Sequence, residues 1–274
     1  MNVKTEDISS AIIDLGLSNK PVCIHSSLRS FGSVDGGAES IVHAFLNQGC
    51  TILVPSFSSR FAVYPPDDQR PERNGCGDYS WFTNNNSTET KNIFTCTTNE
   101  LDRDMGAIPK AVLNMQDRRR GNHPLNSFAA VGPLADELIL EQKPANVYAP
   151  LETLSELNGK VILMGVGLNR LTLLHLAEKM AGRTMFRRWA KEADGSIITV
   201  ETGGCSEGFH KFDEIVSEIS DEITVGESLW RVFDVKRLLG IASKAIQQNP
   251  LITHCGNTDC ERCNDAILGG PILF

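Results

Sequence analysis

Three polar residues in one predicted helix have the types and the spacing that acid–base chemistry needs. Thr172, His175 and Glu178 stand at positions i, i+3 and i+6 of a helical pattern, so at about 100° per residue they share one face. A carboxylate one turn away can orient an imidazole and stabilise its charged form, which suits a general base. The alternative is a solvated helix face with an incidental ion pair, and spacing alone favours that alternative.

A second group of polar residues lies in the segment CIHSSLRSFGSVDGG, where an apolar run ends in hydroxyls and glycines. Small residues let a ligand approach the backbone, and free N–H groups with Ser26, Ser27 and Ser30 can bind an amide or a phosphate. The segment lacks the GxxxxGK[ST] pattern of a P-loop and the GxGxxG pattern of a dinucleotide site. An ordinary loop is an equally weighted alternative.

The densest basic spot is RRRGNHPLNSF, which begins with Arg118, Arg119 and Arg120. Arginines bind phosphates through paired N–H donors, so this segment is a candidate for an anionic ligand. For Arg118 and Arg119, a solvated run of charge is the favoured interpretation.

The last cluster is HCGNTDCERC, in which Cys255, Cys260 and Cys263 follow a C-x4-C-x2-C pattern. In a reducing compartment such spacing indicates metal binding or redox chemistry more often than a disulfide. A structural zinc needs a fourth ligand, either His254 or a distant residue such as Cys205. Reduced thiols without a metal are the favoured alternative, so a structural zinc is a hypothesis only.

The elements that must position these residues alternate along the chain. Strand-like runs begin near 21, 51, 128, 160 and 196, and helical patterns cover 37–47, 105–115, 135–142, 171–182, 211–220 and 228–247. This alternation predicts an α/β fold with a mixed central sheet flanked by helices. We expect one domain over residues 1–274, with a Cys-rich segment at 254–263 and a long irregular insertion at about 58–98. Such an insertion covers a site, is mobile, or is an idle surface loop.

The amino-acid composition indicates which classes of binding partner, such as nucleic acids or membranes, the protein is expected to lack. The 274 residues carry a net charge of −8 and are 41% hydrophobic, which is typical of a soluble globular protein and argues against general nucleic-acid binding. The sequence has no apolar run of the 18–20 residues that a membrane helix requires, and its start lacks the features of a secretory signal. We therefore expect a cytoplasmic protein without a membrane or nucleic-acid partner, and leave a homodimer open.

Taken together, the motifs resemble the aminoglycoside 3-N-acetyltransferase family, antibiotic acetyltransferases that differ from the GNAT fold. The resemblance rests on five segments between about residues 20 and 180, which stand in the family's order. They are VCIHSSLRSFGSVDGGAESIVHAFL, TILVPSFS, MGAIPKAVL, NHPLNSFAAVG and VILMGVGLNRLTLLHLAE.

The resemblance implies transfer of an acetyl group from acetyl-CoA to an amine of an aminoglycoside, with antibiotic resistance as the consequence. It implies that His175 is the base that deprotonates the substrate ammonium, with Glu178 beside it. Thr172 is placed to donate to the developing oxyanion or to position the amine. The residues that the resemblance assigns to the pantetheine and phosphate arms of CoA are His25, Ser26, Ser27, Leu28, Arg29, Ser30, Arg120, His123, Pro124, Ser127 and Phe128.

Two departures from the family concern the acceptor. Asn169 stands where the family often has an acidic residue, and Lys110 stands where it often has Glu. Both changes remove carboxylates that would attract a cationic sugar, so acetyl-CoA is better supported than the acceptor. The alternatives are a CoA-dependent N-acyltransferase of the same fold for another amine, and a non-catalytic binding protein stabilised by zinc.

Overall fold

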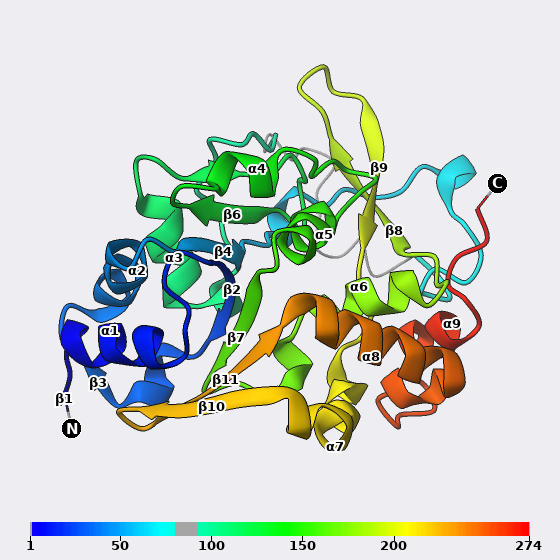
Figure 1. The fold of residues 1–274 in the computed structure, drawn as a ribbon. Coiled ribbons are helices and arrows are strands. Elements are labelled where there is room, and N and C mark those ends of the chain that lie inside the picture. Colours follow the sequence, from blue (N-terminus) through cyan, green and yellow to red (C-terminus); the bar gives the residue numbers. More distant parts are fainter. Residues whose placement is uncertain (1, 80–92, 274) are drawn as a thin grey trace.

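A seven-stranded mixed sheet forms the centre of the molecule (Figure 1). The computed structural model describes residues 2–79 and 93–273. The strands lie in the order β10-β11-β7-β2-β4-β6-β5; β2 runs parallel to β4 and β7, and the remaining pairs are antiparallel. Their bounds are β2 (Pro21–Ser26), β4 (Thr51–Pro55), β5 (Arg119–Arg120), β6 (Phe128–Val131), β7 (Lys160–Met164), β10 (Ser220–Val225) and β11 (Ser228–Asp234). The predicted α/β class with a mixed sheet is confirmed.

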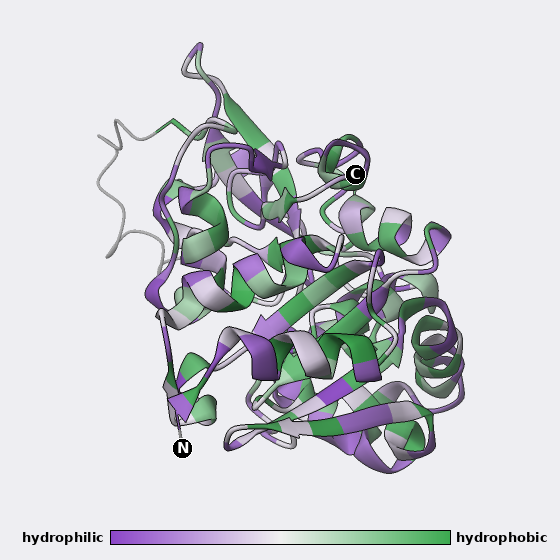
Figure 2. Ribbon diagram, turned by 60° about the vertical axis from the view of Figure 1, so that its left-hand side comes forward, coloured by the Kyte–Doolittle hydropathy of each residue, from purple (hydrophilic) through white to green (hydrophobic). Residues whose placement is uncertain are grey.

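Helices cover both faces of this sheet because its central strands are apolar on both sides (Figure 2). In β7, Ile162 and Met164 pack on one face, whereas Val161 and Leu163 pack on the other. The first face carries α1 (Thr5–Asp14), α2 (Gly37–Asn47) and α3 (Ala107–Asn114). The second face carries α4 (Ala135–Ile139), α5 (Ala149–Glu156), α6 (Leu173–Met180) and α8 (Val235–Gln248).

Smaller elements surround this core. The hairpin of β8 (Phe186–Lys191) and β9 (Ile197–Thr202) projects from one end, and β1 (Asn2–Val3) pairs with β3 (Ser33–Val34). The described part of the chain also contains the helices α7 (Asp213–Val216) and α9 (Glu261–Ile267). Its short 3-10 turns are η1 (Leu28–Phe31), η2 (Ser59–Phe61), η3 (Asp67–Gln69), η5 (Arg103–Met105), η6 (Leu168–Arg170), η7 (Glu207–Phe212), η8 (Ser217–Ile219) and η9 (Pro250–Thr253). Within the described ranges no helix has the length and apolar content needed to cross a membrane.

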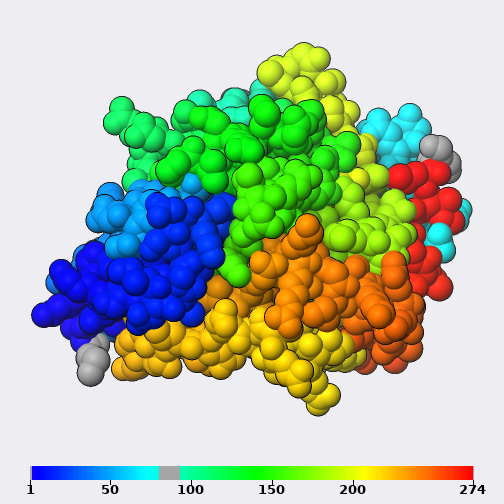
Figure 3. Space-filling view, in the orientation of Figure 1, coloured from blue at the N-terminus to red at the C-terminus, as the bar shows by residue number. Residues whose placement is uncertain are grey.

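The predicted insertion at 58–98 packs against the projecting hairpin and the C-terminal region. The N–H of Val63 donates to the carbonyl of Trp189 at 2.9 Å, and the N–H of Gly75 donates to a carboxylate oxygen of Asp265 at 2.8 Å. The space-filling view shows this segment (cyan) beside the C-terminal residues (red) (Figure 3). None of its described residues lines the main cavity, and residues 80–92 lie outside the described part of the chain.

The predicted helix at 228–247 is wrong over its first seven residues. Residues Ser228–Asp234 form β11, an antiparallel strand between β7 and β10, and the helix α8 begins only at Val235. Trp230 is fully buried, with its ring 5.9 Å from that of Phe31, whereas Leu229 is 46% exposed. This period-two pattern is typical of a strand, and its short apolar run resembles a buried helix segment when it is read alone.

Candidate active site

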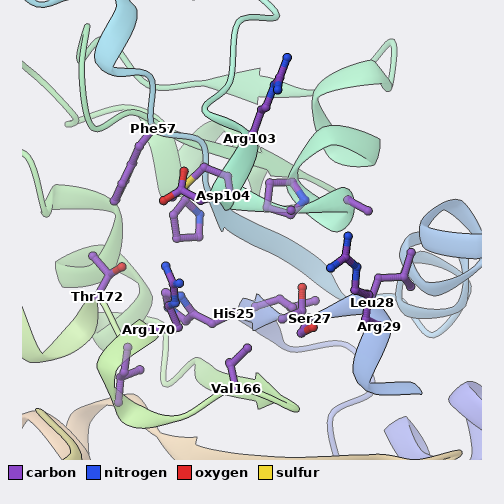
Figure 4. A pocket seen from close by; sticks show the side chains of 18 of the residues that line it. His25, Ser27, Leu28, Arg29, Phe57, Arg103, Asp104, Val166, Arg170 and Thr172 are labelled. Atoms are coloured by element: carbon purple, nitrogen blue, oxygen red, sulfur yellow. The ribbon is translucent and has the colours of Figure 1, made fainter. Parts of the chain in front are cut away.

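The main cavity opens where the parallel strands end. Its volume is about 910 Å³, and residues that follow β2, β4 and β7 form its walls together with η5 and the start of α6. In Figure 4, Asp104 lies across the cavity from His25 and Arg170, and Thr172 lies beneath Phe57. Ligands in open α/β sheets bind at this edge, because the connections after neighbouring parallel strands diverge there.

His175 and Glu178 form a buried pair at one end of this cavity. His175 lies in the first turn of α6 and lines the cavity, and its Nδ1 is 2.7 Å from Oε2 of Glu178. An ionised carboxylate can only accept a hydrogen bond, so Nδ1 carries the proton and Nε2 has its lone pair free to take another. Thr172, just before α6, also lines the cavity. The predicted catalytic residues are therefore brought together.

The second oxygen of Glu178 is held by an arginine that sequence reasoning did not identify. The guanidinium of Arg183 donates to Oε1 of Glu178 at 2.5 Å, to Oγ1 of Thr253 at 2.7 Å and to the carbonyl of Pro250 at 2.7 Å. Arg183 and Glu178 are both buried. This network fixes the carboxylate, and through it the plane of the His175 ring.

Aromatic rings and a glycine enclose the imidazole. The Phe209 ring centroid lies 4.8 Å from that of His175, and the Tyr148 ring lies nearly parallel to it at 6.2 Å. A Cβ added at Gly203 would stand 2.4 Å from the Tyr148 hydroxyl and 2.9 Å from Cδ2 of His175. No larger residue fits without moving the ring. The pair of glycines in the sequence TGGC is the one signal that marks this approach.

The hydroxyl-rich segment after β2 reaches the cavity as predicted, with one exception. His25, Ser26, Ser27, Leu28 and Arg29 line the wall. Ser30 is absent from the lining; its hydroxyl donates to the carbonyl of Ser27 at 2.7 Å and lies 2.8 Å from Oγ of Ser228. Burial lowers the pKa of His25 to about 4, so its imidazole is neutral at physiological pH.

The second predicted ligand group lies outside the cavity. Arg120, His123, Pro124, Ser127 and Phe128 are all buried, and none of them lines the cavity wall. Nε2 of His123 donates to the carbonyl of Glu201 at 2.8 Å, and burial lowers the pKa of this histidine to about 4. Because protein atoms surround these side chains, the geometry does not support their assignment to CoA.

Arg120 instead ties one wall of the cavity to the sheet. Its guanidinium donates to Oγ of Ser127 at 2.9 Å, to the carbonyl of Ser56 at 2.7 Å and to the carbonyl of Glu100 at 2.9 Å. A further bond of 2.5 Å reaches the carbonyl of Thr98. These bonds hold the chain that leads into η5, whose residues line the cavity.

The described lining of the cavity is rich in positive charge. Arg29, Arg103 and Arg170 line it, and Asp104 is the one acidic residue among the described lining residues. Asn169 also belongs to the wall, whereas Lys110 does not. The net charge of −8 is therefore distributed elsewhere on the molecule.

Four cysteines gather near the C-terminus. Sulfur atoms of Cys205, Cys255, Cys260 and Cys263 all lie within 4.8 Å of one another. Cys205 thus joins the three predicted cysteines. His254, the other candidate for a fourth position, has both ring nitrogens in hydrogen bonds, to Asn264 and to the N–H of Gly256.

Sequence comparisons show that this chain is similar to known enzymes. A family profile described as aminoglycoside 3-N-acetyltransferase matches residues 23–247. Aminoglycoside N(3)-acetyltransferase IV of Salmonella sp is 26% identical over 260 residues, covering 90% of this chain and 88% of that protein. Aminoglycoside N(3)-acetyltransferase IX of Micromonospora chalcea is 32% identical over 187 residues, covering 64% of this chain and 61% of the relative.

Solved structures share the fold over nearly the whole chain. A mutant of aminoglycoside acetyltransferase AAC(3)-IVa in complex with a gentamicin superposes with a TM-score of 0.78 at 24% identity, covering 98% of both chains. A binary complex of AAC-IIIb with CoASH gives a TM-score of 0.73 at 19% identity, covering 90% of this chain and 97% of that one. At these identities the likeness establishes the fold.

Proposed function

The chain belongs to the aminoglycoside 3-N-acetyltransferase family, and we propose that it transfers the acetyl group of acetyl-CoA to an amino group of an aminoglycoside. It is an acetyltransferase. The observation that carries the proposal is the buried pair of His175 and Glu178 at the end of a cavity whose other walls offer hydroxyls and arginines. Related solved structures that hold a gentamicin or CoASH support the two ligand classes.

His175 acts as the general base. An ammonium group cannot attack a thioester, so Nε2 of His175 takes one proton and leaves a neutral amine with a lone pair. That amine attacks the acetyl carbonyl carbon; the C–N bond forms, the C–S bond breaks, and the thiolate of CoA leaves with a proton returned from the imidazolium. The nitrogen of the new amide gives up its second proton through the imidazole to solvent, so one proton is released overall. Glu178 stabilises the imidazolium, and Arg183 holds Glu178 in position.

Thr172 and the segment after β2 provide binding groups. The hydroxyl of Thr172 lies at the N-terminus of α6 on the cavity wall, where it can donate to the oxyanion or position the amine. Ser26, Ser27 and Arg29 supply hydroxyl and guanidinium donors for the amides and phosphates of CoA. Ser30 supports this segment from behind.

The charge of the cavity favours a second candidate acceptor. Three arginines face one carboxylate in the described lining, and Asn169 adds no charge. Some of these arginines are expected to bind the phosphates of CoA. A polycationic sugar, however, needs carboxylates that take the place of the water around its ammonium groups. An amine with fewer positive charges, acetylated by the same residues, is therefore the second candidate.

An acetyl-transfer assay over a panel of amines separates the two acceptors. The purified protein is incubated with acetyl-CoA and either 2-deoxystreptamine aminoglycosides or monoamines and amino acids, and acetylated products are identified by mass spectrometry. Acetylation of the 3-amino group of an aminoglycoside supports the proposal. Turnover of monoamines alone supports the second candidate, and an absence of turnover with every amine, despite binding of CoA, rejects both.

A further inference from the structure

The four clustered cysteines have the arrangement of a metal site. In a tetrahedral zinc–thiolate centre with bonds of about 2.3 Å, neighbouring sulfurs lie about 3.8 Å apart. The sulfurs of Cys205, Cys255, Cys260 and Cys263 all lie within 4.8 Å of one another, which approaches that spacing. They come from two places in the chain: Cys205 lies in the connection after β9, whereas Cys255 and Cys260 precede α9 and Cys263 lies in its first turn, so folding alone has assembled them.

The surroundings suit thiolate ligands. The backbone N–H of Cys255 donates to the sulfur of Cys263 at 3.3 Å, and such N–H···S bonds stabilise the negative charge of bound thiolates. Because hydrogen bonds occupy both nitrogens of His254, Cys205 completes the set of four.

We propose that Cys205, Cys255, Cys260 and Cys263 together bind one structural Zn²⁺ through their four thiolates. Four sulfur donors within 4.8 Å of one another select a soft or borderline metal over Mg²⁺ or Ca²⁺. Binding releases the thiol protons to solvent and involves no electron transfer. With four protein ligands the coordination is complete, so the ion supports the fold and does not touch the substrates.

The position of this site gives the metal a further role, which rests on the proposed role of His175. Cys205 lies two residues after Gly203, which contacts the imidazole ring, and immediately before Ser206 in the cavity wall. Cys255 lies two residues after Thr253, which binds Arg183. The ion therefore joins the segment beside the His175 ring to the segment that holds its carboxylate, and acts as a clamp on the base.

Metal content tests the site without any substrate. The chain is expressed with added zinc, purified under reducing conditions and analysed by plasma emission spectroscopy. We expect about one zinc per chain in the wild type and in the control C96S, because Cys96 is exposed and lies outside the cluster. C205S and C260S are expected to lose the metal.

Loading the wild-type protein with cobalt tests the metal site even if the cysteine variants do not fold. Wild-type protein stripped of metal and loaded with Co²⁺ is expected to show thiolate-to-cobalt charge transfer and the visible bands of a tetrahedral ion. A wild type that holds neither zinc nor cobalt, with all four thiols reactive toward a thiol reagent in the folded protein, overturns the proposal. This result is independent of whether any amine is acetylated.

The clamp has its own measurement. Removal of the zinc is expected to lower the melting temperature and kcat together, with a smaller change in the Kd for CoA, because the donors proposed for CoA follow β2, whereas the cysteines flank the segments that hold His175 and Arg183. Loss of the metal with kcat unchanged contradicts the clamp while leaving the metal site itself intact.

Discussion

At the scale of single residues, the site depends on how one imidazole is held. Glu178 fixes Nδ1 of His175, Arg183 fixes Glu178, and Gly203 lets the backbone pass close to both the imidazole and the Tyr148 hydroxyl. Spacing on one helix made the first pair a candidate, and the resemblance to the acetyltransferase family turned that candidate into a prediction. Tyr148 and Gly203 come from distant segments, and Arg183, although it follows Glu178 by five residues, is held by the distant Thr253 and Pro250. Local sequence patterns do not contain this tertiary packing.

Gly203→Ala is expected to lower kcat by about 10- to 100-fold, because the added Cβ would displace the His175 ring from its position. Steady-state rates of acetyl transfer, with circular dichroism to confirm folding, provide the measurement. The matched control is Gly240→Ala on the exposed side of α8, where a Cβ meets nothing within 4 Å. That control should gain about 0.5–1 kcal/mol of stability at unchanged kcat. Equal rates in both variants would mean that the close approach at Gly203 has no role in positioning the base.

At the scale of elements, the ends of parallel strands gather the site. Alternating strand and helix patterns predicted β2, β4 and β7 and therefore the edge at which a cavity forms. The same reasoning missed β11, because its Trp230 and Phe233 read equally well as one face of a helix. It also assigned Arg120 and His123 to a ligand. The sequence alone does not distinguish an arginine that donates to carbonyls of distant segments from an arginine that lines a cavity.

Arg120→Leu is expected to destabilise the fold by about 1–3 kcal/mol and to raise the KM values, because carbonyls of Ser56, Thr98 and Glu100 lose their donor. The neighbouring Arg119 pairs with Asp136 at the surface, so Arg119→Leu serves as the control and should leave the melting temperature and KM nearly unchanged. Urea unfolding and steady-state kinetics on both variants test this role. If Arg120 bound the phosphates of CoA directly, its loss would weaken CoA binding without affecting stability.

At the scale of the whole molecule, charge and pH connect the sequence to the site. Global composition predicted an acidic globular chain with a net charge of −8. The described cavity lining reverses that sign locally with three arginines. A sum over the chain carries no information about where charges lie, so it could not predict the electrostatics of the pocket.

Stability is expected to fall as the pH drops from 6.5 to 5. Burial lowers the pKa of His25 and of His123 to about 4 in the folded protein, whereas unfolded histidine titrates near 6.5. In this interval the unfolded state binds more protons, so each histidine costs on the order of 1–2 kcal/mol of unfolding free energy. Denaturant titrations across this range are expected to show a smaller loss in His123→Gln. His43→Gln, at an exposed position, should retain the full loss. Identical slopes in wild type and His123→Gln would show that His123 does not contribute.

The central claim is that His175 removes the proton from the acceptor amine, and the rate of acetyl transfer by His175→Gln tests it most directly. With acetyl-CoA and an accepted amine both saturating at neutral pH, we predict a loss of about 10²- to 10⁴-fold in kcat relative to the wild type. The Kd for CoA, measured by calorimetry, should change little. A variant that binds CoA normally and acetylates the amine within a few-fold of the wild-type rate would contradict the account.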